Sequence, residues 1–201
     1  QIQTDMASVW EEEFNTIKGK RGFIQNKVMS GRHNYSARNI IIAGSGYLHA
    51  NEIEVCYSTF IELFRYELCS FYAKLKSCSI KTAQLEWNKA KNHFNSDFYN
   101  IMRCIIKDKK NAPYIRLMIN RNPSINFGAF LYCKIVRVKP SVSDKTMTIN
   151  TRIIKTLNAD FDGDVLNIFR IPGADLGNKF AKNMDPTYNL YINRINGRVN
   201  P

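Results

Sequence analysis

Apolar residues recur along this chain at two different spacings, and each change of spacing marks a change of element. In residues 4–16, Met6, Trp10 and Phe14 stand at helical spacing, which predicts a helix. Asn39 to Leu48 begins with three consecutive isoleucines, and this β-branched run predicts a buried strand that ends in a glycine-containing turn. The two spacings together predict a fold of the α+β class.

Two long apolar stripes at helical period follow in the middle of the chain. One runs from Ile53 to Leu75 and the other from Leu85 to Ile105, with a break at Ser77 to Lys81. They predict two helices whose apolar faces form core or subunit-contact surface.

Strand-like patterning returns after Pro113. Apolar, β-branched segments are bounded there by Pro, Gly and Asp, and they predict strands at Tyr114 to Ile119, Ala129 to Val138, Thr146 to Leu157 and Val165 to Ile171. A short helix is predicted around Leu176 to Met184.

The charge of the chain indicates the kind of partner it binds. The 201 residues include 29 Lys and Arg against 17 Asp and Glu, a formal charge of +12, which favours a polyanionic partner. Phe14 to Asn51 contains no acidic residue, and glycines interrupt the periodicity from Lys18 to Arg38. We therefore expect a basic loop that approaches phosphates closely. Its candidate nucleic-acid-binding residues are Lys18, Lys20, Arg21, Arg32 and Arg38.

The clearest candidate chemistry lies in three alternating aspartates, Asp160, Asp162 and Asp164. At this spacing they can converge on one side of a bent strand–loop–strand, and converging carboxylates repel one another unless a cation lies among them. Oxygen ligands suit a hard ion such as Mg²⁺, which often assists phosphoryl or nucleotidyl transfer. Without a cation the segment would be an acidic turn between two strands.

A calcium-binding EF-hand loop is a third possibility for the same aspartates, and the sequence argues against it. Val165 stands at the sixth loop position, where Gly is needed. Ile171 stands at the twelfth position, where Glu is needed.

The segment Asn158-Ala159-Asp160-Phe161-Asp162-Gly163-Asp164 resembles the signature of the largest, beta-prime-like subunit of multisubunit DNA-dependent RNA polymerases. In that family the three aspartates hold the catalytic magnesium, so the resemblance implies that they are the metal ligands and the catalytic residues here. It also implies a two-ion Mg²⁺ mechanism, in which the aspartates hold one ion and the second arrives with the nucleotide.

A second resemblance lies upstream, where Asn120-Arg121-Asn122-Pro123-Ser124 is similar to another marker of the same family. It implies that Arg121, Pro123 and Asn158 bind substrate, with Arg121 and Asn158 contacting the ribose hydroxyls. Structural roles remain open for both residues, because Arg121 could be a surface arginine beside a Pro turn and Asn158 could stabilise a turn.

The basic loop resembles the family's switch region, which grips template DNA, through Lys18-Gly19-Lys20-Arg21-Gly22 and Tyr35-Ser36-Ala37-Arg38. Asn34 stands where the family usually has Asp. The family's His after the aspartates is missing from Asn167 to Pro172, which suggests a divergent, viral or phage-type member. Met184 to Asn189 is similar to a further family element, so the resemblance runs from about Lys18 almost to Pro201.

By this resemblance the fold is a double-psi β-barrel with a helical insertion, preceded by a basic switch-like loop. Residues 1–38 would form a helix and the DNA-facing loop, and residues 39–172 the barrel with its insertion at about 52–110. Residues 173–201 would form a C-terminal helix and tail leading to the next polymerase module. The family's clamp, bridge helix and trigger loop do not fit in 201 residues, so a fragment or one piece of a split subunit is expected.

The implied function is that of a catalytic subunit of a DNA-directed RNA polymerase, a nucleotidyltransferase active only in the multisubunit assembly. The implied partners are a beta-like second-largest subunit, further beta-prime pieces, template DNA, RNA product and nucleoside triphosphates. Two alternatives remain: a single-chain or RNA-templated polymerase of the same barrel superfamily, and a non-catalytic nucleic-acid-binding scaffold. The complete set of three aspartates argues against the scaffold.

Cysteine usage and hydropathy bear on the compartment. The five cysteines show no metal-ligand spacing and are odd in number, so neither a zinc site nor a disulfide framework is indicated. No apolar run approaches the roughly 20 residues of a membrane span. We expect a soluble, intracellular protein without a membrane partner, in the host cytoplasm or packaged in a virion if the protein is viral.

Overall fold

The computed structural model describes residues 2–19, 21–28, 31, 33–44, 46–108, 115–125 and 127–187. The chain divides into two compact units, residues 1–34 and residues 35–201. None of the helices in these described ranges is long and apolar enough to cross a membrane.

The first unit contains the predicted N-terminal helix, α1 (Ile2–Ile17), which confirms the helical spacing of its apolar residues. The predicted basic loop is partly regular, because Ile24–Val28 form a short π-helix, η1. Arg38 lies outside this unit: it belongs to strand β1, which begins at Ser36, three residues before the predicted start.

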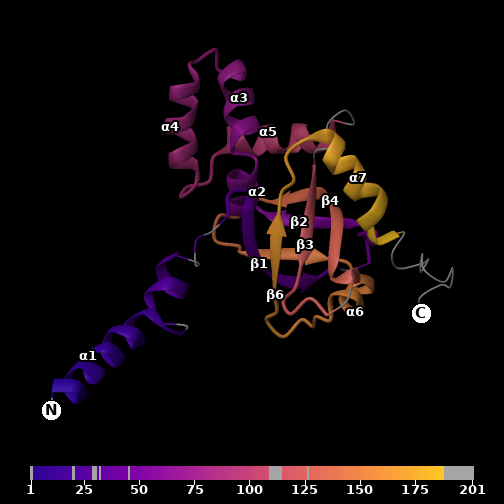
Figure 1. Ribbon diagram of the computed structural model, residues 1–201. Helices are drawn as coiled ribbons and strands as arrows, with labels where there is room; N and C mark the ends of the chain where they lie inside the picture. The colour runs from indigo at the N-terminus through magenta and orange to yellow at the C-terminus, as the bar shows by residue number, and fades with distance from the viewer. Residues whose placement is uncertain are drawn as a thin grey trace. The chain divides into compact units, whose positions relative to one another are not determined.

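The second unit is built on a closed six-stranded barrel (Figure 1). Around the barrel the strands follow the order β1-β5-β2-β4-β3-β6. Their bounds are β1 Ser36–Ala43, β2 Glu52–Cys56, β3 Arg116–Asn120, β4 Phe130–Lys139, β5 Thr146–Ile149 and β6 Val165–Phe169. The fold is therefore α+β with a closed barrel, as the sequence predicted.

Strand pairing in the barrel is unchanged when the first three strands are exchanged for the last three. With β1 exchanged for β4, β2 for β5 and β3 for β6, the parallel pair β1·β5 becomes the parallel pair β2·β4. The antiparallel pair β1·β6 likewise becomes the antiparallel pair β3·β4. The antiparallel pairs β2·β5 and β3·β6 map onto themselves. The barrel thus has an internal two-fold pattern of pairing.

The barrel interior is filled by aliphatic side chains that alternate along the strands with outward-facing ones, as the two-residue period of a strand requires. Every strand contributes to this core, and the innermost residues are at most 1% exposed: Ile41, Ile53, Val55, Leu117, Ile119, Leu131, Ile135, Met147, Ile149, Leu166 and Ile168. Burial of this much apolar area is the main stabilisation of the fold.

The helical insertion differs from its prediction at both the start and the interior. Residues 52–56 form barrel strand β2, so the helices begin only at Tyr57. Four helices then stand where two were predicted: α2 Tyr57–Leu63, α3 Arg65–Leu75, α4 Ile80–Ala90 and α5 Ser96–Lys107. The second predicted helix is broken after Ala90, and Asn95 caps the new start by accepting hydrogen bonds from the N–H groups of Asp97 and Phe98.

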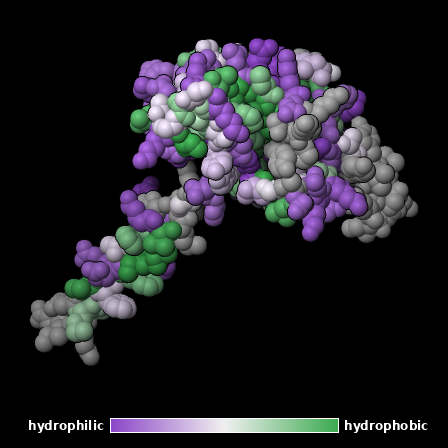
Figure 2. Space-filling view, turned by 90° about the horizontal axis from the view of Figure 1, so that it is seen from above, coloured by the Kyte–Doolittle hydropathy of each residue, from purple (hydrophilic) through white to green (hydrophobic). Residues whose placement is uncertain are grey.

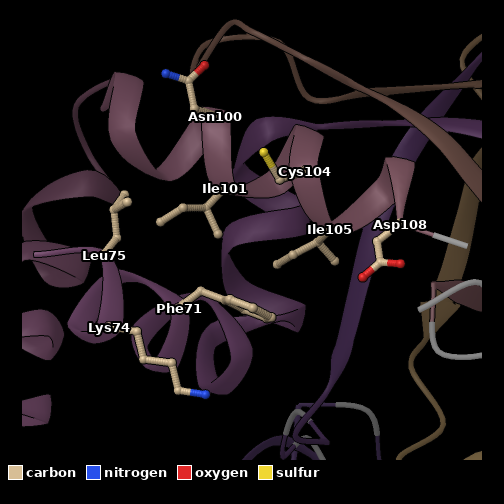
Figure 3. A pocket seen from close by; sticks show the side chains of 8 residues that line it. All are labelled: Phe71, Lys74, Leu75, Asn100, Ile101, Cys104, Ile105 and Asp108. Atoms are coloured by element: carbon tan, nitrogen blue, oxygen red, sulfur yellow. The ribbon is translucent and has the colours of Figure 1, made fainter. Parts of the chain in front are cut away.

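A groove lies between α3 and α5 on the surface of the insertion, with a volume of about 540 Å³. Figure 3 shows Phe71 and Leu75 of α3 on one side and Ile101 and Ile105 of α5 on the other. Phe71 is 43% and Leu75 62% exposed, although the sequence allowed both to be core. Seen from above, hydrophobic side chains gather over the insertion among hydrophilic ones (Figure 2).

The end of the described chain returns to the barrel. The predicted strand Thr146 to Leu157 is strand only to Ile149; a 3₁₀ turn, η4 (Thr151–Ile153), and a short helix, α6 (Ile154–Leu157), follow. After β6, α7 (Ala174–Met184) packs on β4 and ends at the buried Asp185. Asp185 pairs with Arg116 of β3 at 2.9 Å, which ties the end of α7 to the barrel.

Candidate metal centre

The aspartate loop connects the C-terminus of α6 to the start of β6, so a helix, not the expected strand, precedes it. Asn158 ends the helix in the left-handed conformation (φ 49°), which Asn tolerates better than most residues. Gly163 has φ 117°, a conformation that a side chain would strain, and it turns the chain between Asp162 and Asp164. The carbonyl of Asp164 accepts the N–H of Ile41, which fixes the loop's end to β1 at 3.0 Å.

The three aspartates converge as their spacing predicted. One carboxylate oxygen from each of Asp160, Asp162 and Asp164 lies within 4.8 Å of the others. Asp160 and Asp162 are exposed and Asp164 is half-buried, so the cluster opens to solvent on one side. This is the only group of three or more such side chains with metal-binding spacing in the described part of the chain.

Arg121 reaches the cluster from the end of β3. Its Nε lies 2.7 Å from Oδ2 of Asp164, and its Nη2 donates to Oδ1 of the same carboxylate at 3.1 Å. Its Nη1 donates to the carbonyl oxygen of Asn158 at 2.5 Å. A planar guanidinium can make such a two-pronged contact, and lysine cannot. Arg121, Asn158 and the aspartates therefore form one site across 43 residues of sequence.

The buried side-chain amide of Asn120 stabilises the turn that carries Arg121. Asn120 is 3% exposed, and its Nδ2 donates to the hydroxyl of Ser124 at 2.8 Å and to the carbonyl of Ala129 at 3.0 Å. Pro123 lies in this turn, exposed to solvent. Asn120 was not singled out from the sequence, because nothing local distinguishes a buried turn-holding Asn from a surface one.

The ionisation of the aspartates reflects these contacts. A hydrogen bond with the Asp162 carboxyl, together with the nearby negative charges, raises the pKa of Asp160 above its ordinary value. The guanidinium of Arg121 and the N–H of Asp160 hold the pKa of Asp164 below its ordinary value. The loop thus contains one carboxylate, Asp164, that the Arg121 guanidinium stabilises. It also contains two crowded carboxylates, Asp160 and Asp162, that a further cation would stabilise.

The residues present fit a hard divalent cation. All three side-chain donors are carboxylate oxygens, which Mg²⁺ prefers. Ligands of one octahedral Mg²⁺, each about 2.1 Å from the ion, lie roughly 3–4.2 Å apart. Oxygens within 4.8 Å of one another would need to close by at most about 1.8 Å to reach the distance between adjacent ligands. Exposure on one side leaves room for water or substrate oxygens.

The predicted nucleic-acid-binding residues are distributed differently. Lys18 and Arg21 are exposed in the first unit, where the Nζ of Lys18 lies 5.3 Å from the ring centre of Phe14. Arg38 is exposed on β1 in the second unit. Lys20 and Arg32 lie outside the described residues. These side chains therefore belong to separate parts of the chain.

Comparison with known proteins gives one consistent result. No protein-family model matches the chain. It is 26% identical over 161 residues to the DNA-directed RNA polymerase subunit beta' of Leuconostoc pseudomesenteroides, covering 79% of this chain and 15% of that protein. It is 24% identical over 184 residues to the DNA-directed RNA polymerase subunit beta' of Orientia tsutsugamushi (strain Boryong), covering 90% of this chain and 12% of that protein. The chain thus spans less than a sixth of these relatives. Distant and partial as they are, the similarities support a relationship to the beta' subunits of DNA-directed RNA polymerase.

Proposed function

We propose that this chain carries the catalytic metal site of a DNA-dependent RNA polymerase and takes part in Mg²⁺-dependent nucleotidyl transfer. The observation that carries the proposal is the convergence of Asp160, Asp162 and Asp164 within 4.8 Å. Similarity to beta' subunits supplies the reaction class.

Each residue at the site has a proposed task. Asp160, Asp162 and Asp164 hold the cation. When bound, Mg²⁺ supplies charge stabilisation for the attacking and leaving oxygens, with a second ion arriving on the nucleotide. Arg121 and Asn158 contact ribose hydroxyls, to which a guanidinium and an amide can both donate. Pro123 lines the substrate side of the turn that carries Arg121.

For the fold we propose the double-psi type of barrel. Two parallel pairs in a closed barrel, related by the exchange of its first and last three strands, support this proposal. We also propose the functional division into residues 1–38, 39–172 and 173–201. The first would grip template DNA as a switch-like segment through Lys18, Lys20, Arg21, Arg32 and Arg38; the run of residues without Asp or Glu supports that role.

The proposed partners are a beta-like subunit and the remaining pieces of a beta-prime subunit, with template DNA, RNA and nucleoside triphosphates bound between them. Large apolar side chains exposed on the insertion, among them Phe71 and Leu75, support burial by another chain in an assembly. We propose an intracellular location, in the host cytoplasm or a virion. The missing His between Asn167 and Pro172 supports a viral or phage-type polymerase.

The test is Asp162→Asn in the reconstituted assembly. The substitution removes one charge without a change of side-chain volume, so assembly and DNA binding should stay within a few-fold of wild type. RNA extension should be lost, since the exposed cluster would keep only two carboxylates. Asp175→Asn, at an exposed position on α7, is the matched control and should extend RNA normally. Extension by Asp162→Asn within a few-fold of wild type would refute the metal assignment.

A further inference from the structure

Arg121 and a divalent cation require the same carboxylate, and we propose that they compete for it. Arg121 holds Asp164 when no cation is bound, and it lowers the affinity of the three aspartates for the cation until a substrate hydroxyl draws the guanidinium away. The competition rests on the proposed function. It goes further, because it concerns how metal and nucleotide binding are coupled at the site.

Three of the five N–H groups of the Arg121 guanidinium already have protein acceptors. Nε and Nη2 of Arg121 contact the two oxygens of Asp164 at 2.7 Å and 3.1 Å, and Nη1 donates to the carbonyl of Asn158 at 2.5 Å. All three nitrogens thus have protein acceptors. Beyond these contacts one N–H on each Nη can donate to a ribose hydroxyl, and a hydroxyl that draws the guanidinium toward itself would lengthen the contacts with Asp164, which face the cluster.

The Asp164 carboxylate is also engaged by several donors. Oδ2 accepts from Nε of Arg121 and from the N–H of Asp160 at 3.1 Å, while Oδ1 accepts from Nη2. A carboxylate has about four lone-pair sites, so three of them are filled. The side chains of Arg121 and Asp164 are 22% and 19% exposed, so water screens their interaction only in part. By contrast, Asp160 and Asp162 are open to solvent.

Two consequences follow from this arrangement. A cation bound among the aspartates would lie beside a guanidinium of like charge, and it would share with it the charge of Asp164. If a ribose hydroxyl draws the Arg121 guanidinium away, the full negative charge of Asp164 becomes available to the cation. Because binding linkage is reciprocal, a bound cation would also loosen Arg121 and raise its availability to the ribose.

The opposite role for Arg121 predicts the opposite sign. If Arg121 only positioned Asp164 as a ligand, then its loss would weaken metal binding, as loss of outer-shell partners usually does. Competition predicts that its loss strengthens metal binding. The direction of the change therefore separates the two roles without any measurement of activity.

The experiment is a titration of the complete chain with Mn²⁺, in which electron paramagnetic resonance reports the free ion. Arg121→Gln should bind Mn²⁺ more tightly than wild type by a factor of about 5 or more. A factor of about 5 is the lower end of the usual range for coupling between two binding sites. Arg121→Lys keeps the charge but cannot cover both oxygens, so its affinity should fall between the two. Lys155→Gln removes one exposed positive charge from α6, and its affinity should stay within about two-fold of wild type.

Each outcome has a distinct meaning, provided that circular dichroism shows folded variants. Equal or weaker Mn²⁺ binding by Arg121→Gln overturns the competition but leaves the metal site in place. An equal gain in Lys155→Gln also overturns it, because the effect would then be one of net charge. Asp162→Asn is also made alone and together with Arg121→Gln. If it reduces Mn²⁺ binding in neither case, the proposed function itself is overturned.

Discussion

Asp185→Asn should detach the end of α7 from the barrel and lower the stability of the second unit. Asp185 is 5% exposed and accepts hydrogen bonds from Arg116 at 2.9 Å, from Asn51 at 3.1 Å and from the N–H of Thr187 at 3.0 Å. An asparagine would keep one acceptor oxygen and turn an NH₂ group toward donors. It would also leave Arg116 without its ion pair.

The size of the effect follows from burial. Loss of one partner from a fully buried pair costs about 3–5 kcal/mol. The Arg116 side chain is 19% exposed and regains some hydration. We therefore expect a loss of about 2–3 kcal/mol. For a chain of this size that is a fall in Tm of roughly 4–12 °C. Asp175→Asn, on the exposed side of α7, should cost no more than about 0.5 kcal/mol.

The pH dependence of this difference supplies a second check. Burial alone would raise the pKa of Asp185, but the hydrogen bonds from Thr187, Arg116 and Asn51 outweigh it and lower the folded-state pKa. A depressed pKa means that the stabilisation is present above the unfolded value of about 3.9 and is lost as pH falls through the folded value. The gap in Tm between wild type and Asp185→Asn should thus be constant near pH 7 and narrow below about pH 4. Thermal denaturation followed by circular dichroism measures the gap in Tm at each pH. A gap below about 2 °C at pH 7, or one that widens in acid, would refute the anchoring role.

Three further results are expected. Arg121→Ala should reduce the preference of the assembled enzyme for ribonucleotides over 2′-deoxyribonucleotides, measured as a ratio of kcat/KM values; equal losses for both substrates would indicate positioning instead. Joint neutralisation of Lys18, Lys20 and Arg21 should flatten the salt dependence of DNA binding by about one log–log unit per lost phosphate contact, and an unchanged slope would remove this segment from the DNA path. Asn39→Ala should destabilise the barrel by about 1–3 kcal/mol in chemical denaturation, because this 3%-exposed amide accepts from Thr59 and donates to the Lys145 carbonyl; a loss below about 0.5 kcal/mol would contradict that account.

Local patterns made part of the fold predictable. Asp160, Asp162 and Asp164 lie within five consecutive residues, so their convergence depends on one turn, and Gly163 permits that turn. The strands β3, β4 and β6 follow β-branched runs bounded by turn residues. Information of this kind is carried by the nearest neighbours in sequence, which a single sequence contains.

Strand β2 could not be predicted for a physical reason. Its residues 52–56 run directly into α2, and Ile53 and Cys56 happen to continue the helical spacing of the apolar residues after Tyr57. Glu54 also reads as a solvent-facing helix residue, yet it is 3% exposed and pairs with Arg137 at 2.5 Å. Pairing with β4 and β5 makes this segment a strand, and both partners are far away in sequence.

Long-range charge pairs were invisible for the same reason. Arg121 and Asp164 are 43 residues apart, and Arg116 and Asp185 are 69 apart. The sequence marked Arg121 as a substrate-binding residue through a resemblance, but no local pattern indicated that its guanidinium rests on one of the aspartates. The coupling proposed for the metal centre therefore depends on the three-dimensional arrangement alone.

The central claim is that Asp160, Asp162 and Asp164 together hold a divalent cation. Crystals of the chain, alone or in its assembly, soaked with saturating Mn²⁺ and measured at an X-ray energy where manganese scatters anomalously, test it most directly. The account predicts one strong anomalous peak within about 2.2 Å of an oxygen from each of the three carboxylates. The peak should vanish in Asp162→Asn crystals treated in the same way. A wild-type crystal with no peak there, or with its strongest peak at other residues, would contradict the account.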